Sequence, residues 1–141
     1  MLKFSKKVEY GLMSIMHIAR MKGNKVTARE LSEQYNIPPE ILGKVLQKLK
    51  KDQLLESIQG VNGGYRIIRE LTDISLEDVI ISLDGPVVIT HCCKGTGDDC
   101  TQFKTCNIIE PMQKFQNKLN KLFSDMNLND FFFDEEQKVE F

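Results

Sequence analysis

All four cysteines of this 141-residue chain lie in one short segment between His91 and Cys106. The other residues of the segment are mainly Gly, Asp, Thr and Lys, which cannot order themselves by forming an apolar core. Thiolates are the ligands that soft metal ions and iron–sulfur clusters prefer. The segment is therefore a candidate iron–sulfur site, with structural zinc, thiol redox chemistry and unreactive thiols as the alternatives.

The alternatives would use the same residues in different ways. Zinc would take the thiolates together with His91, which supplies the fourth ligand of a tetrahedral site with three Cys and one His. A thiol switch would use the neighbouring Cys92 and Cys93. The colour of an anaerobic preparation distinguishes an iron–sulfur cluster from a zinc site, because a cluster is brown and a zinc site is colourless.

The first residues, Met1–Lys7, lead directly into an amphipathic pattern, and neither a signal peptide nor an apolar run of membrane-spanning length is found. We therefore expect a cytoplasmic protein with no membrane partner. Reducing conditions in the cytoplasm disfavour structural disulfides and favour metal or redox use of clustered Cys.

Charge divides the chain into two halves. Residues 1–70 carry 13 Lys and Arg against 7 Asp and Glu, whereas residues 71–141 carry 6 against 13. The basic half predicts a nucleic-acid surface, with chance segregation of solvated charge as the alternative. We predict a DNA-binding domain over residues 1–70 and a cysteine-loop sensor and dimerisation region over residues 71–141.

The basic half contains the elements of a winged helix. Apolar spacing predicts a helix from Ser5 to about Met21, and the capping box of Thr27–Glu30 begins a second helix. Pro39 is suited to the first position of a third helix that ends at Lys51. The residues expected on its inner face are Ile41, Leu42, Val45, Leu46 and Leu49. Two β-prone runs around Asn62-Gly63 then predict a hairpin, and this order is that of a winged helix-turn-helix.

The outer face of the third helix is the candidate DNA-reading surface. Gly43 costs helix stability, so it predicts either a close approach to DNA or close packing against another helix. Lys44 and Lys48 are candidate phosphate contacts, although a lysine stripe is also the ordinary form of a solvated face. The predicted DNA-contacting residues are Ser5, Lys6, Thr27, Arg29, Pro39, Glu40, Gly43, Lys44, Gln47, Lys48, Gln59, Asn62 and Gly63.

The acidic half predicts two further helices around the cysteines. Ser75 caps a helix that Gly85-Pro86 ends, and a long helix begins near Pro111. The long helix has a wide apolar stripe, which must pack on the first helix of its own chain or on a second subunit. The expected fold is mainly α with a small β-hairpin: a winged helix-turn-helix followed by a long C-terminal dimerisation helix.

No catalytic constellation is found, because the chain has only two His, and His17 falls within a helix where we expect it to be packed. We therefore expect a regulator and not an enzyme. The alternative from another class is an iron–sulfur electron carrier or assembly protein. Such a protein has no use for a winged helix, so binding to a DNA duplex separates the two.

The order of these motifs resembles the Rrf2 family of bacterial transcription regulators. The resemblance rests on Ser5-Lys6-Lys7, Glu9–Leu12, the wing Gly60–Tyr65, Leu83–Pro86 and the spaced Cys before a long helix. It implies a homodimer with crossing long helices, two winged helices on a pseudo-palindromic operator of double-stranded DNA, and a 2Fe–2S or 4Fe–4S cluster. It also implies that the cluster senses redox state, nitric oxide or iron and cluster supply.

The resemblance further implies a set of ligands. Cys100 and Cys106 fit the family spacing, and the first ligand is Cys93 or Cys92. Some members add a His three residues after the third Cys, but here that position is Ile109. Others use a carboxylate from the first helix of the partner subunit, and Glu9 occupies that place. Many relatives have Arg where this chain has Gln59.

Overall fold

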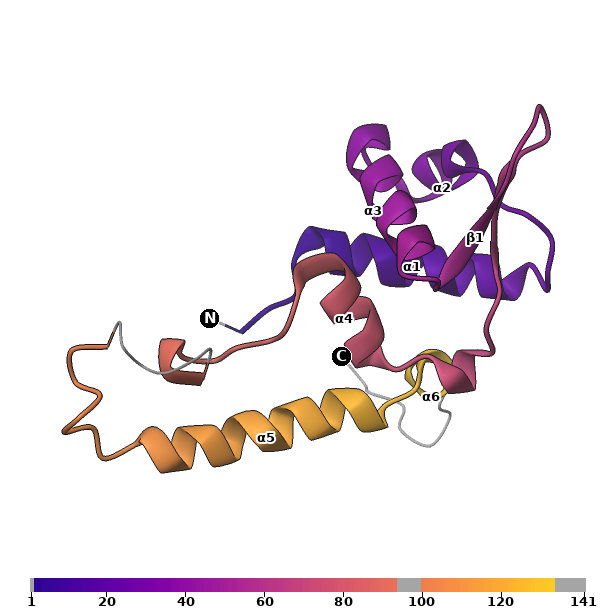
Figure 1. Cartoon of the computed structure of the whole chain (residues 1–141). Helices are drawn as coiled ribbons and strands as arrows, with labels where there is room; N and C mark the ends of the chain where they lie inside the picture. The colour runs from indigo at the N-terminus through magenta and orange to yellow at the C-terminus, as the bar shows by residue number, and fades with distance from the viewer. Residues whose placement is uncertain (1, 94–99, 134–141) are drawn as a thin grey trace, which may run out of the picture.

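The computed structural model describes residues 2–93 and 100–133, and within them the chain is mainly helical with one two-stranded sheet (Figure 1). The predicted fold class, a winged helix-turn-helix with a long helix after it, is confirmed. The elements in chain order are α1 (Lys6–Arg20), α2 (Ala28–Tyr35), α3 (Pro39–Lys51), β1 (Leu55–Ile58), β2 (Gly64–Ile67), η1 (Leu71–Asp73), α4 (Leu76–Asp84), η2 (His91–Cys93), α5 (Ile109–Asp125) and α6 (Leu128–Phe133).

Side-chain caps fix the starts of α1, α2 and α4, and the capping boxes of α2 and α4 are those that the sequence predicts. The Thr27 hydroxyl accepts the Glu30 amide over 3.1 Å, and the Glu30 carboxylate accepts the Thr27 amide over 3.3 Å. Ser75 forms a similar box at the start of α4, and Ser5 accepts the Val8 amide at the start of α1. Each cap satisfies backbone amides that have no partner within the helix.

The wing is a hairpin of β1 and β2, with Leu55 opposite Ile67 and Ile58 opposite Gly64. The predicted hairpin around Asn62-Gly63 is confirmed, and its turn spans residues 59–63. The residue with positive φ is Gly60, at 110°, and the Gly63 amide donates to the Gly60 carbonyl over 2.9 Å. A glycine is favoured at residue 60 because other residues rarely adopt this conformation.

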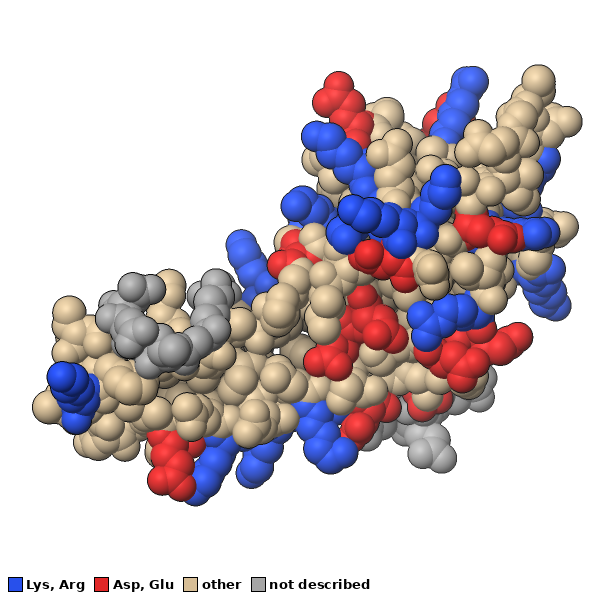
Figure 2. Space-filling model, viewed as in Figure 1, with Lys and Arg blue, Asp and Glu red and all other residues tan. Residues whose placement is uncertain are grey.

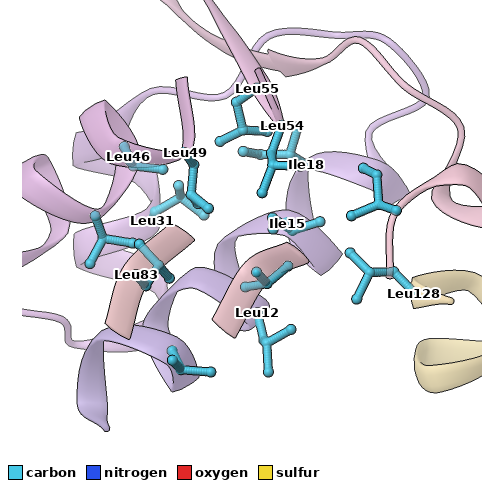
Figure 3. Close-up of a cluster of buried hydrophobic side chains, with 14 of the residues drawn as sticks. Leu12, Ile15, Ile18, Leu31, Leu46, Leu49, Leu54, Leu55, Leu83 and Leu128 are labelled. Atoms are coloured by element: carbon cyan, nitrogen blue, oxygen red, sulfur yellow. The ribbon is translucent and has the colours of Figure 1, made fainter. Parts of the chain in front are cut away.

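The core lies between the first four α-helices and the base of the wing (Figure 3). Ile15, Leu46 and Leu49 have 0% exposure there. Leu83 on α4 and Leu128 on α6 belong to the same core, so residues from both sides of the predicted boundary at residue 70 are buried together.

One residue of the expected inner face is exposed. Ile41 is 40% exposed, whereas Leu42 and Leu46 are fully buried, so the prediction that Ile41 points inward was wrong. It lies at the edge of the apolar stripe and lines a surface hollow of about 390 Å³ with Val45 and Leu83. The helix period places it just outside the buried arc.

The long helix α5 is mostly uncovered. Figure 1 shows it running below the rest of the chain, with its N-terminal half beyond the winged helix. Near its C-terminal end the Phe123 ring lies 6.1 Å from the Phe4 ring, while Phe115 and Leu122 are 53% and 54% exposed. The chain's own N-terminus therefore covers only part of the predicted apolar stripe. No helix among the described residues is long and apolar enough to cross a membrane.

Candidate DNA interface and cysteine site

The outer face of α3 carries the residues predicted to read DNA. Glu40, Lys44, Gln47 and Lys48 are exposed there, and Pro39 is the first residue of the helix. A Cβ built on Gly43 meets no heavy atom of the described chain within 4 Å. Close packing against another described helix is thus excluded as the reason for Gly43, and the surface around it is open within the described part of the chain.

Basic side chains gather on this part of the molecule. Figure 2 shows Lys and Arg over α3 and its surroundings, and Asp and Glu mainly below them. Figure 1 shows the wing turn and the N-terminal end of α3 projecting to the same side. A basic helix beside a projecting hairpin matches the shape of a duplex groove and the charge of its phosphates, whereas the wing turn, Gln59–Gly63, carries no charged side chain.

The other predicted DNA contacts lie at the starts of helices and in the wing. Ser5 and Thr27 cap α1 and α2, where each hydroxyl accepts a backbone amide and keeps its own proton for donation. Arg29 forms an ion pair with Glu33 at 2.8 Å, and this contact raises the pKa of Arg29. Gln59 and Asn62 are exposed in the wing turn, where Gly63 is half-buried.

Sequence reasoning did not identify a polar link between α3 and α4. The Asp52 carboxylate accepts the Ser82 hydroxyl over 2.6 Å and the Lys48 ammonium over 2.9 Å. These two hydrogen bonds, with Ser82 the larger influence, hold the pKa of Asp52 below its usual value. Neither residue belongs to a local motif, and they are far apart in sequence, so no sequence signal pointed to the pair.

The cysteines flank residues 94–99, which lie outside the described part of the chain. Cys92 and Cys93 are in η2, where the Thr90 hydroxyl lies 3.0 Å from the Cys92 sulfur and 3.2 Å from the Cys93 sulfur. Cys100 and Cys106 follow in the stretch before α5, and all four thiols are free and half-buried. The structure thus brings Cys92 and Cys93 together under one hydroxyl. Among the described residues, no three His, Cys, Asp or Glu side chains converge into a metal site.

Two further predicted residues have defined partners. The Glu9 carboxylate lies 2.6 Å from the Lys6 ammonium, and this contact raises the pKa of Lys6. His17 shares a hydrogen bond of 2.8 Å with the Tyr35 hydroxyl, and the two rings meet edge to face. The prediction that His17 is a packed residue is therefore confirmed.

A winged helix with a basic reading face, followed by a cysteine segment and a long helix, defines a winged-helix transcription regulator. The sequence model of the Rrf2 family, described as "Iron-dependent Transcriptional regulator", matches residues 4–134. The chain therefore belongs to the Rrf2 family. It is a regulator and not an enzyme, as the sequence predicted.

Individual relatives agree with this assignment. The chain is 26% identical to the HTH-type transcriptional regulator IscR of Vibrio atlanticus over 136 residues, which are 96% of this chain and 78% of the relative. It is 34% identical over 87 residues to an HTH-type transcriptional regulator of Mycobacterium tuberculosis. That match covers 61% of this chain and 54% of the relative, so it spans about half the relative's length.

Solved structures share the fold. CymR, the global cysteine regulator of B. subtilis, is similar with a TM-score of 0.70 and 24% identity, over 93% of this chain and 96% of CymR. T. potens IscR is similar with a TM-score of 0.67 and 23% identity, over 99% of this chain and 94% of that protein.

Proposed function

We propose that this chain is a homodimeric regulator that binds a pseudo-palindromic DNA operator and changes its affinity with the state of an iron–sulfur cluster. The cluster ligands would be Cys100, Cys106 and one of Cys92 and Cys93. The observation that carries the proposal is that four free, half-buried thiols stand in one segment next to the long helix. The iron-dependent description of the family supports it.

The donor set fits an iron–sulfur cluster by its chemistry. Thiolates bind iron of clusters strongly, and partial exposure of all four sulfurs leaves them accessible for assembly. Among the described residues the candidate ligands do not form a preformed cage, so cluster assembly would have to bring the thiolates together. When bound, the cluster would supply a group that oxidants, nitric oxide or iron shortage can modify or remove.

The proposed operator contact uses the outer face of α3 and the wing. Lys44 and Lys48 would contact phosphates, and the open backbone at Gly43 would allow the helix to approach base edges. A second copy of the chain would cover Phe115 and Leu122 on α5, because exposed apolar side chains of this size are stabilised by burial. Two winged helices would then face two half-sites.

Anaerobic purification of the full chain, followed by absorption spectroscopy and iron and sulfide analysis, tests the cluster. We expect visible absorption with matching iron and sulfide. Cys100→Ala and Cys106→Ala should each abolish the absorption while the dimer persists, and only one of Cys92→Ala and Cys93→Ala should do so. Stoichiometric zinc in a colourless anaerobic preparation would contradict the proposal.

A thiol-based regulator is the second candidate. It is favoured by the contact of both the Cys92 and Cys93 sulfurs with the single Thr90 hydroxyl. The similarity of fold to CymR, a global cysteine regulator, is consistent with it. In that case the colourless, zinc-free protein would lose or gain DNA affinity on oxidation of Cys92 and Cys93. A gel shift with operator DNA also separates both candidates from an electron carrier, which would not bind the duplex.

A further inference from the structure

The most buried side chain of the long helix is polar. Gln116 is 6% exposed, whereas its apolar neighbour Phe115 is 53% exposed. Along the whole of α5, Gln116 is the one residue that is buried. Burying an amide is unfavourable unless its donors and acceptor are satisfied, so a glutamine at this position requires specific partners.

The partners are backbone groups of the segment that leads to the cysteines. The Gln116 side-chain carbonyl accepts the Ile89 amide over 2.9 Å, and its amino group donates to the Val87 carbonyl over 2.7 Å. The amino group also donates to the Asn120 side-chain carbonyl over 2.8 Å, one helical turn away. The side-chain amide thus bonds the segment as a neighbouring strand would, through one donor and one acceptor on the same edge.

The bonded segment continues directly into the thiol pair. Thr90 follows Ile89, and its carbonyl accepts the Cys93 amide over 3.1 Å. Its hydroxyl contacts both sulfurs at 3.0 and 3.2 Å. Hydrogen bonds therefore connect Gln116 to Ile89, and the next residue, Thr90, contacts both Cys92 and Cys93.

We infer that Gln116 is a positioning residue, which fixes the segment Val87–Ile89 against α5 and so sets the placement of Cys92 and Cys93. This inference rests on the proposed function for its purpose, because the thiols are positioned for the cluster or switch proposed above. In this arrangement α5, the proposed dimer helix, holds the segment that leads to Cys92 and Cys93. Dimer geometry and thiol placement are then coupled through one amide.

The test compares Gln116→Leu with Gln113→Leu in the full chain. Gln113 is exposed on the same helix, so the control makes the same substitution without removing the Gln116 hydrogen bonds to Val87 and Ile89. In the reduced, metal-free protein, mass spectrometry measures the rate of iodoacetamide alkylation at each Cys, and hydrogen exchange measures protection of residues 87–93. We expect Gln116→Leu to raise the alkylation rates of Cys92 and Cys93 and to lower the protection by at least about five-fold. The variant loses two hydrogen bonds to the segment, and one alone changes local opening by about that factor.

The Cys106 rate and the exchange of α1 to α3 should remain at the wild-type value in both variants. Asn120→Ala keeps both backbone bonds and should change the Cys92 and Cys93 rates in the same direction but less. It serves as the test if Gln116→Leu does not fold. The inference is overturned if Gln116→Leu folds and its Cys92 and Cys93 alkylation rates equal those of the wild type and Gln113→Leu. If only Asn120→Ala folds, the inference is overturned when its rates equal those of the wild type.

Cluster lifetime separates this inference from the proposed function. In anaerobic cluster-loaded protein, we expect the visible absorption of Gln116→Leu to decay about five-fold faster on exposure to air. If the wild type holds no cluster but Gln116→Leu still accelerates alkylation, the positioning role stands and the cluster proposal fails. If the wild type holds a cluster and neither alkylation nor decay changes, the positioning role fails and the cluster proposal stands.

Discussion

Ser82 on α4 donates a hydrogen bond of 2.6 Å to the carboxylate of Asp52, the residue at which α3 ends. The same carboxylate accepts the ammonium of Lys48, a predicted DNA contact. The Asp52 carboxylate therefore links α4 to the C-terminal end of α3 and to one of its lysines. A change in the position of α4 would change the hydrogen bond between the Lys48 ammonium and the Asp52 carboxylate.

Replacement of Ser82 by Ala should lower the free energy of unfolding by about 1 kcal/mol, the typical contribution of one hydrogen bond. Ser82 is 6% exposed, so water replaces its hydroxyl contact poorly. Urea denaturation of the metal-free protein at fixed concentration measures the change. The matched control is Ser124→Ala on α5, where the hydroxyl bonds only the Lys121 carbonyl at the surface. Equal stabilities of the two variants would contradict this prediction.

The contribution of Asp52 should depend on pH in a defined direction. The Ser82 and Lys48 hydrogen bonds lower the pKa of Asp52 in the folded state. The ionised form is therefore favoured by folding, and its stabilisation is present above the unfolded-state pKa and lost as the pH falls through the lower folded-state pKa. The stability difference between wild type and Asp52→Asn should be present at neutral pH and disappear in acid. A difference that persists unchanged in acid would exclude the ionised Asp52 carboxylate as its source.

The effects of Gly43→Ala should separate stability from DNA binding. The added Cβ meets nothing within 4 Å in the described chain, so helix propensity should stabilise the fold by up to about 1 kcal/mol. DNA affinity should fall, because the methyl group blocks a close approach to the groove. Gly11→Ala is the contrast, since its Cβ would lie 2.5 Å from the Leu83 side chain and should give no such gain. Unchanged affinity in Gly43→Ala would show that this backbone does not approach DNA.

Replacement of Lys44 or Lys48 by Ala should weaken binding to all DNA sequences. Each lost phosphate contact should reduce the slope of log affinity against log salt by about 0.9. Lys121→Ala is the control, because this residue lies on α5 and pairs with Asp125. Titrations at several salt concentrations measure the slopes. If the double variant at Lys44 and Lys48 keeps the wild-type slope, α3 is not the reading element.

The sequence allowed the elements to be predicted because their signals are local. The capping box at Thr27, Pro39 at the first turn of α3 and the glycines of the wing each act within a few residues. The predicted hairpin around Asn62-Gly63 is confirmed, whereas the positive φ of Gly60 depends on the strand register, which the local sequence does not specify.

The links between elements could not be predicted in this way. Asp52 with Ser82, and Gln116 with Ile89, are polar contacts between residues far apart in sequence. Nothing in the neighbourhood of either residue indicates its partner, because an exposed polar residue and a buried, bonded one have the same local pattern. The sequence therefore located the thiols but not the side chains that hold their segment.

The last prediction concerns Glu9 as a cluster ligand from the partner subunit. Glu9 is on α1, and its side chain is 43% exposed beside the Lys6 ammonium at 2.6 Å. A carboxylate is a harder and weaker ligand for iron than a thiolate, so its release could free α1 and change the separation of the two winged helices. Exposed ion pairs contribute little to stability, so the Lys6 contact would not prevent Glu9 from turning to a cluster.

The variants Glu9→Ala and Lys6→Ala separate the two roles, because both remove the ion pair but only the first removes the carboxylate. We expect Glu9→Ala to assemble a cluster with an altered spectrum and faster loss, and the DNA affinity of its loaded form should move toward that of the cluster-free protein. Lys6→Ala should keep the wild-type spectrum and cluster lifetime, even if it loses a phosphate contact. Absorption and circular dichroism spectra, decay rates in air and the ratio of loaded to cluster-free DNA affinity measure these outcomes. Identical spectra and lifetimes in the two variants would mean that Glu9 is not a ligand and acts only as the surface partner of Lys6.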